Sequence, residues 1–229
     1  MGVAPALFLF DIDGTLMRQA GPHHREALED AIRLVTGRLA LLDGIPVAGM
    51  LDSDILIRSM RAAGMRLLEV RALLPAVMEK AQLLYSRRCP DLRRRVCPGV
   101  RRLLPRLLRR GVVTGLVTGN LSRIAWKKLD RAGLRPFFRF GAFAEMGPTR
   151  AQLVKLARRR AVAEGWIPRR ARVFLVGDHP NDVLAARLSG CISVAVATGL
   201  TPRKELAAHQ PDHLLDDLRA FDLSILVTE

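Results

Sequence analysis

The chain has 229 residues, of which 49% are hydrophobic, and it carries a formal net charge of +15 at neutral pH. This length and composition are sufficient for a buried core and exclude a disordered linker. The longest apolar runs, such as residues 192–197, are only as long as a strand, so we expect no membrane span.

The positive charge comes mainly from arginines along predicted helices, for example residues 93–95 and 158–160. Aromatic residues make up only 5% of the chain, too few for a surface on which nucleic-acid bases stack. We therefore favour a solvated basic surface and disfavour a nucleic-acid partner. A basic protein that binds anionic partners remains an alternative.

Three cysteines, Cys89, Cys97 and Cys191, are an odd number without closely spaced metal-ligand pairs. Such usage favours reduced thiols in the cytoplasm over a disulfide framework. The first residues lack a basic segment followed by an apolar stretch and a cleavage site, so we expect no export signal. We expect a cytoplasmic monomer or homodimer.

The first predicted strand, residues 7–10, is followed by a long stretch without strand alternation, residues 17–94. Its first helix should begin after Gly21 and Pro22 and end at Gly37, with Leu28, Ile32 and Val35 on one face. The next helix should begin at Asp52 and Ser53, as capping residues, and end at Gly64. Proline 75 should divide the remaining apolar stretch into two helices.

After residues 97–99, strands are predicted over residues 112–117, 138–143, 173–176 and 192–197, most of them followed by a turn and a helical pattern. This alternation is typical of a parallel sheet covered by helices on both faces. The sequence thus predicts a doubly wound, Rossmann-like α/β core formed by residues 1–16 and 95–229. Residues 17–94 are predicted to form an inserted α-helical domain.

The first strand ends in two carboxylates, Asp11 and Asp13, just before Gly14. Ligands bind at the carboxyl ends of the strands in open α/β sheets. One aspartate is explained by turn capping, but a second close carboxylate is repelled unless a cation lies nearby.

Polar residues also follow two other predicted strands. Thr118, Gly119 and Asn120 suit a phosphate at a helix start, although Asn120 as an ordinary helix cap is an equal alternative. Asp178 and Asp182 flank Pro180 at the start of another helix. Acid, hydroxyl or amide side chains thus follow three different predicted strands, and this coincidence predicts one shared ligand site.

These residues resemble the haloacid dehalogenase-like (HAD) hydrolase superfamily over nearly the whole chain. The run from Asp11 to Thr15 is similar to the first motif of that family, Thr118 to the second, and residues 177–182 to the fourth. Residues 17–94 resemble its C1 cap, and residues 45–52 resemble the cap segment of phosphoglycolate phosphatase-like members. This likeness implies a small phosphorylated metabolite as the substrate.

The resemblance implies that Asp11 is the nucleophile and that Asp13 is the general acid and base. It also implies a Mg²⁺ ion held by the Asp11 carboxylate, the Asp13 backbone carbonyl and Asp178, with Asp182 supporting these ligands. The expected reaction is Mg²⁺-dependent hydrolysis of a phosphomonoester through a phospho-aspartate, with 2-phosphoglycolate as the first substrate to test.

The third motif of the family, usually a lysine, has no direct match in this sequence. We favour Arg150 as the phosphate-binding cation, because its planar donors suit phosphate, with Lys155 as the runner-up. Just after the chain enters the predicted helical insertion, Arg25 is a candidate substrate-binding residue, ahead of His23 and His24. We expect three further residues, Trp126, Trp166 and Cys191, to pack in the interior and to take no part in the site.

The sequence leaves three other functions to consider. A phosphosugar mutase on the same scaffold remains the main alternative, and a non-catalytic basic binding protein is the second. A dehalogenase is disfavoured because Asp13, the acid that phosphoryl leaving groups need, is present.

Overall fold

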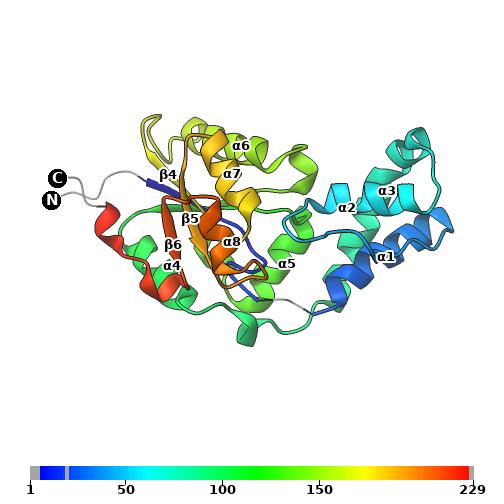
Figure 1. Ribbon diagram of the computed structural model, residues 1–229, viewed down its shortest axis with the longest axis horizontal. Coiled ribbons are helices and arrows are strands. Elements are labelled where there is room, and N and C mark those ends of the chain that lie inside the picture. The colour runs from blue at the N-terminus through cyan, green and yellow to red at the C-terminus, as the bar shows by residue number, and fades with distance from the viewer. Residues whose placement is uncertain (1–5, 19–20, 227–229) are drawn as a thin grey trace.

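Six parallel strands form the central sheet of the computed structural model, which describes residues 6–18 and 21–226 (Figure 1). The predicted strands are confirmed to within two residues at each end, and a short sixth strand at the sheet edge was not predicted. The strands, in the spatial order β3-β2-β1-β4-β5-β6, are β1 (Ala6–Phe10), β2 (Val113–Val117), β3 (Phe140–Ala142), β4 (Arg172–Gly177), β5 (Ile192–Val196) and β6 (His213–Leu215).

Strand β1 lies at the centre of the sheet, and all five of its residues are buried. A continuous apolar run is expected there, because helices cover both faces of a parallel sheet. Phe10, the last residue of β1, pairs with Leu116 of β2 on one side and with Val176 of β4 on the other. This register brings the residues that follow the three strands to the same edge.

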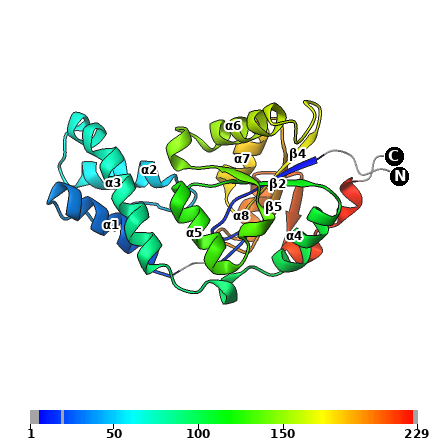
Figure 2. The ribbon, with the colours of Figure 1, turned by 180° about the vertical axis from the view of Figure 1, so that it is seen from behind.

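Helices cover both faces of the sheet. In both views α6 and α7 lie on one side of it, while α4 and α5 lie on the other (Figures 1 and 2). The predicted doubly wound α/β core is therefore confirmed, with the change of direction between β1 and β4 marking the usual place for a ligand. The helices of the core are α4 (Val100–Arg109), α5 (Ser122–Ala132), α6 (Arg150–Ala163), α7 (Pro180–Leu188) and α8 (Arg203–Ala208). Short 3-10 turns are η1 (Arg93–Arg95), η2 (Arg135–Phe137), η3 (Ala144–Met146), η4 (Leu218–Ala220) and η5 (Leu223–Leu226).

The helical insertion predicted between the first two strands is present, and its three helices form a group beside the core (Figure 1). They are α1 (His23–Thr36), α2 (Asp52–Ala62) and α3 (Leu67–Arg88). Helix α1 buries Leu28 and Ile32 as predicted, and it ends at Gly37, whose φ of +69° favours glycine.

Two predictions within the insertion are wrong. Helix α3 runs without a break through Pro75. Proline removes one hydrogen bond to the carbonyl of Arg71, but both residues are exposed, so that carbonyl is accessible to solvent on the outer face of the helix. Neither Asp52 nor Ser53 caps α2: Leu51 is the N-cap, and no side chain bonds to the helix start.

Within the described residues no helix is both long enough and apolar enough to cross a membrane. The three cysteines are free and buried, and Trp126 and Trp166 pack against Phe143 and Phe140, as expected. Parts of the two predicted core segments, residues 1–5 and 227–229, lie outside the described residues.

Candidate active site

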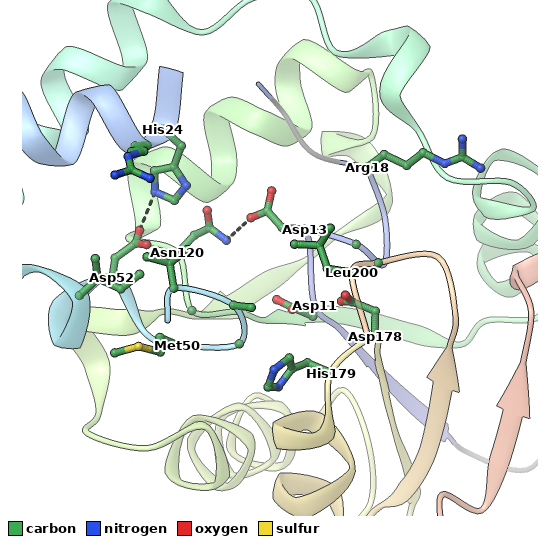
Figure 3. Close-up of a pocket in the computed structure, with 18 of the residues that line it drawn as sticks. Asp11, Asp13, Arg18, His24, Met50, Asp52, Asn120, Asp178, His179 and Leu200 are labelled. Atoms are coloured by element: carbon green, nitrogen blue, oxygen red, sulfur yellow. Dashed lines mark hydrogen bonds and ion pairs between the residues drawn. The ribbon is translucent and has the colours of Figure 1, made fainter. Parts of the chain in front are cut away.

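The carboxyl ends of β1, β2 and β4 open into a cavity of about 840 Å³, which helix α1, residues 47–50 and Asp52 line from the other side. Figure 3 shows Asp11 and Asp178 side by side in this cavity. Most of the predicted site residues line it, and Thr118 is fully buried next to them. The predicted residues that line the cavity are Asp11, Asp13, Arg25, Gly119, Asn120, Arg150 and Asp178.

Three buried carboxylates form a cluster at the ends of β1 and β4. Asp11, Asp178 and Asp182 each offer one oxygen, and these oxygens lie within 4.8 Å of one another. Burial, followed by the charges of Asp11 and Asp182, raises the pKa of Asp178 to about 8. Burial also raises the pKa of Asp182, against the opposing charge of Arg150. The cluster therefore resists full ionisation while no cation is bound.

Glycines make room for Asp178. A Cβ atom on Gly14 would lie 2.1 Å from Asp178 Oδ2, and one on Gly199 would lie 1.7 Å from the same atom. Gly14 also has a φ of +82°, which side-chain-bearing residues rarely adopt. The hydroxyl of Thr15 donates a hydrogen bond to Asp178 Oδ1 at 3.0 Å. The carboxylate of Asp178 is thus held in one position by its surroundings.

This cluster fits a hard divalent cation such as Mg²⁺. Carboxylate oxygens are the ligands that Mg²⁺ prefers, and a divalent charge removes the repulsion that raises the pKa of Asp178. Oδ1 of Asp182 is buried and accepts no hydrogen bond from the described residues. Asp11 and Asp178, whose carboxylates were predicted as metal ligands, both belong to the cluster.

Arg150 is the cation of this cluster. It is the first residue of α6, and the side chain of Thr149 caps the helix start by accepting a hydrogen bond from the Gln152 N–H. Its Nη1 atom lies 3.3 Å from Asp11 Oδ1 and 3.1 Å from Asp182 Oδ1, and the residue is only 7% exposed. Burial lowers the pKa of Arg150, but the two carboxylates more than compensate, so the guanidinium stays charged.

The guanidinium of Arg150 has unused hydrogen-bonding capacity. Both Nε and Nη1 are buried and find no hydrogen-bond partner among the described residues. Nη1 lies close to both carboxylates, but not in the geometry of a hydrogen bond. Lys155, the alternative cation, is exposed on α6 and does not line the cavity. Of the two candidate cations, Arg150 therefore lies in the cavity beside the acid cluster, and Lys155 does not.

The residues after β2 play different structural roles. Thr118 Oγ1 accepts hydrogen bonds from the backbone N–H and the side-chain amide of Asn120, at 3.3 and 2.8 Å. Gly119 approaches the insertion closely, since a Cβ atom there would lie 2.1 Å from the carbonyl oxygen of Met50. Asn120 is not a helix cap: α5 begins at Ser122 and Leu121 is its N-cap.

Asp13 is held by a buried lysine that the sequence analysis did not single out. Lys128 Nζ donates to Asp13 Oδ2 at 2.6 Å and to Asn120 Oδ1 at 2.6 Å. Asn120 Nδ2 donates to the same Asp13 oxygen at 2.8 Å (Figure 3). Burial is the largest influence and opposes ionisation of Asp13, but the charges of Lys128 and His24 and the hydrogen bonds from Lys128 and Asn120 together outweigh it. The pKa of Asp13 therefore lies below its ordinary value.

A signal for Lys128 was present in the sequence. On α5 the buried positions are Ile124, Ala125, Leu129 and Ala132, and Lys128 falls on the same face. A lysine within an apolar stripe is unusual, because a buried charge requires partners. That exception to the helical pattern was sufficient to mark the residue as a site candidate.

The three candidates at the start of α1 lie in different environments. His24 faces the cavity, and its Nε2 lies 3.0 Å from Asp52 Oδ2 (Figure 3). His23 does not line the cavity. Arg25 lines it, but its guanidinium is paired with Glu29 and Asp43 near the surface. The ranking of Arg25 ahead of His24 stays a prediction. In this structure the Arg25 guanidinium is already paired, whereas His24 contacts Asp52 and Lys128.

Comparisons with known proteins identify the family of this chain. A family model described as haloacid dehalogenase-like hydrolase matches residues 5–190. The phosphoglycolate phosphatase of Pseudomonas syringae pv. tomato is 30% identical over 233 residues, which cover 95% of this chain and 79% of that protein. The phosphoglycolate phosphatase of Synechococcus elongatus is 38% identical over 124 residues, which cover 52% of this chain and 54% of that protein.

Solved structures share the fold. CbbY from Rhodobacter sphaeroides, in complex with xylulose-(1,5)bisphosphate, superposes with a TM-score of 0.71 at 20% identity and covers 98% of this chain and 100% of that one. The β-phosphoglucomutase of Clostridium difficile reaches a TM-score of 0.68 at 17% identity, over 98% of this chain and 95% of that one. With the family model and the curated relatives, the fold and site show that the chain belongs to the haloacid dehalogenase-like hydrolase family, as a phosphatase that resembles the phosphoglycolate phosphatases.

Proposed function

We propose that this protein is a Mg²⁺-dependent phosphatase that hydrolyses a small phosphomonoester through a phospho-aspartate on Asp11. The observation that carries this proposal is the position of Asp11, whose carboxylate lies 3.3 Å from Arg150 and within the acid cluster at the cavity floor. A nucleophile, a cation and a candidate metal site thus meet where a phosphate would enter.

In the first step an oxygen of Asp11 attacks phosphorus while the bond to the leaving oxygen breaks. Charge spreads over the equatorial phosphoryl oxygens, and Arg150, with its unused Nε and Nη1 donors, lies where it would stabilise them. The hydroxyl of Thr118 accepts from Asn120 and keeps its own hydrogen to donate to the phosphate. Gly119 is proposed to let the phosphate approach the backbone.

Asp13 protonates the leaving oxygen in this step and removes a proton from water in the second step, which hydrolyses the phospho-aspartate. Asn120, predicted as a phosphate ligand, has its side chain committed to Asp13, Thr118 and Lys128. Its backbone N–H also donates to Thr118 Oγ1, at 3.3 Å, so phosphate binding by Asn120 would require this longer bond to be exchanged for one to the phosphate.

Asp11, Asp178 and the backbone carbonyl of Asp13 are proposed to hold Mg²⁺, which when bound supplies positive charge to the phosphoryl oxygens. Asp182 contacts Arg150 at 3.1 Å and accepts a hydrogen bond from the His179 N–H at 3.1 Å. We assign it to positioning Arg150 beside the metal ligands.

The substrate is proposed to be a small phosphorylated metabolite, and 2-phosphoglycolate is the first choice because of the names of the curated relatives. A cavity of about 840 Å³ suits a molecule of this class. Residues 17–94 are proposed to act as the cap that closes over it, with residues 1–16 and 95–229 as the core domain. The buried free cysteines support a cytoplasmic location.

The test is phosphate release from a panel of small phosphomonoesters, including 2-phosphoglycolate, with Mg²⁺ or EDTA. Release that requires Mg²⁺ supports the proposal, and the best substrate narrows the metabolic role. A phosphosugar mutase would instead return a sugar phosphorylated at a new position. Absence of release from every ester would refute the phosphatase assignment.

A further inference from the structure

A lysine buried inside a protein requires an explanation, because an unpaired buried charge costs several kcal/mol. The side chain of Lys128 is 1% exposed and enters the site from the apolar face of α5. Its ammonium also lies 5.9 Å from the ring centre of the buried Tyr85, on α3. These surroundings fix the position of the Lys128 ammonium.

Each hydrogen of the ammonium has an acceptor. Lys128 Nζ carries three N–H donors, and three acceptors surround it: Asp13 Oδ2 at 2.6 Å, Asn120 Oδ1 at 2.6 Å and His24 Nδ1 at 3.3 Å. No donor remains for a substrate. Lys128 therefore acts through its partners and not by direct contact with the phosphoester.

The contact with His24 extends this arrangement to the helical insertion. Because His24 Nδ1 accepts from Lys128, the ring hydrogen is on Nε2 and is donated to Asp52 Oδ2 at 3.0 Å. The same Asp52 oxygen accepts a hydrogen bond from the backbone N–H of Leu121, just before α5, at 2.9 Å. Asp52 and His24 belong to the insertion, whereas Leu121 and Lys128 belong to the core.

The result is a fixed orientation for Asp13. Its Oδ2 atom accepts from both Lys128 and Asn120. Oδ1 accepts no hydrogen bond from any described residue, and the side chain is 38% exposed in the cavity. One oxygen is therefore anchored and the other is free to exchange a proton with a ligand.

We propose that Lys128 is a positioning residue for this reaction: it anchors Asp13 so that Oδ1 faces the leaving oxygen, and His24 and Asp52 link that anchor to the helical insertion. The proposal rests on the proposed phosphatase function. In the step concerned, which requires the protonated form of Asp13, the bond from phosphorus to the leaving oxygen breaks, the bond from Asp11 to phosphorus forms, and the proton on Asp13 Oδ1 passes to the leaving oxygen. Without Lys128, Asp13 would retain one anchor, Asn120, and would rotate away from this position.

The test uses two esters that differ in their need for an acid. An alkyl leaving group, as in 2-phosphoglycolate, must be protonated as it departs, whereas p-nitrophenolate leaves readily as an anion. The ratio kcat/KM reports the steps up to the first irreversible one, so it isolates the transfer to Asp11 from hydrolysis of the intermediate. For Lys128→Met we expect kcat/KM to fall about 100-fold or more with 2-phosphoglycolate and less than about 5-fold with p-nitrophenyl phosphate.

Two comparisons separate positioning from a purely structural role. Asp13→Asn should show the same selective loss of kcat/KM with 2-phosphoglycolate. Adding Lys128→Met to Asp13→Asn should lower kcat/KM by less than about a further threefold, because both changes remove the same proton transfer from Asp13. The matched control is Lys127→Met, which makes the same chemical change one residue earlier on α5, outside the cavity lining. Lys127→Met should leave both esters unaffected.

Equal losses on the two esters, no loss on either, or a full additive loss in the double variant would overturn the proposal. The aryl ester also reports folding, since its hydrolysis needs an intact nucleophile site. If Lys128→Met is insoluble, Lys128→Gln replaces it. We then expect a smaller loss of kcat/KM with 2-phosphoglycolate but the same preference for the aryl ester. Equal losses of kcat/KM on the two esters in Lys128→Gln would also overturn the proposal. If the wild-type protein hydrolyses no ester of the panel, the proposed function itself fails and this inference falls with it.

Discussion

Replacement of Arg150 by methionine tests the electrostatic core of the site. Methionine has a similar length and no charge, so the change removes the guanidinium without leaving a large gap. At 3.1 and 3.3 Å, each attraction between the guanidinium and a carboxylate is about 5 kcal/mol at an effective dielectric constant of about 20. Desolvation offsets much of this in the resting enzyme, but the transition state adds negative charge at the same point.

Arginines that stabilise a transferring phosphoryl group contribute about 10³-fold to 10⁵-fold in rate. We expect the lower end for Arg150→Met, a fall in kcat/KM of about 10³-fold or about 4 kcal/mol, because a bound Mg²⁺ shares the task. The assay is steady-state phosphate release from the best substrate at saturating Mg²⁺.

The control is Lys155→Met, which removes a charge from the exposed face of the same helix. It should change kcat/KM by less than about twofold, in line with other exposed substitutions. Similar small effects from both variants, or a larger effect from Lys155→Met, would refute the assignment of Arg150 as the phosphate-binding cation.

Three further predictions follow from the structure. Gly199→Ala should raise the Mg²⁺ concentration for half-maximal activity at least about tenfold, because the new Cβ would lie 1.7 Å from Asp178 Oδ2; a metal titration measures this, and an unchanged titration would contradict it. Pro75→Ala should stabilise the protein by about 1–2 kcal/mol without changing activity, as judged by urea unfolding, because alanine restores a hydrogen bond within α3. Asp178 has a pKa of about 8 in the folded protein against 3.8 ordinarily, so the folded state binds the proton more tightly and the stability of the Mg²⁺-free protein should fall as pH rises between these values. Mg²⁺ needs the ionised carboxylate, so its stabilising effect in thermal unfolding should be larger at about pH 8 than at about pH 6; a larger effect at the lower pH would contradict the site assignment.

Local patterns were sufficient to predict the core of the fold. The uninterrupted apolar run of β1 predicts a buried central strand, and the two aspartates that follow it predict a ligand site at its carboxyl end. The same reasoning places Thr118 and Asp178 at neighbouring strand ends, because parallel strands bring those ends together. These predictions depend only on residues close in the chain and on the regularity of the sheet.

The errors have a common physical origin in contacts between distant parts of the chain. Asp52 was interpreted as a helix cap, since the sequence does not show that His24 and the N–H of Leu121 compete for its carboxylate. Lys128 reaches Asp13 across 115 positions of sequence, a distance over which periodicity carries no information.

The prediction at Pro75 failed for a different reason. The rule that proline interrupts a helix was overridden by the packing of α3. Helix α3 makes extensive contacts with α1, and the buried residues Val70, Val77, Ala81 and Tyr85 continue one face on both sides of the proline. The energy of that packed face exceeds the loss of one exposed hydrogen bond.

The central claim, a phospho-aspartate on Asp11, is tested most directly by trapping the intermediate. The enzyme would be mixed with substrate and Mg²⁺, quenched in acid within milliseconds, and treated with borohydride, which reduces an acyl phosphate to an alcohol. Peptide mass spectrometry should find homoserine in place of Asp11 in the wild-type protein and no modification in Asp11→Asn. Modification of another residue, or phosphate release at the wild-type rate by a folded Asp11→Asn protein, would contradict the mechanism.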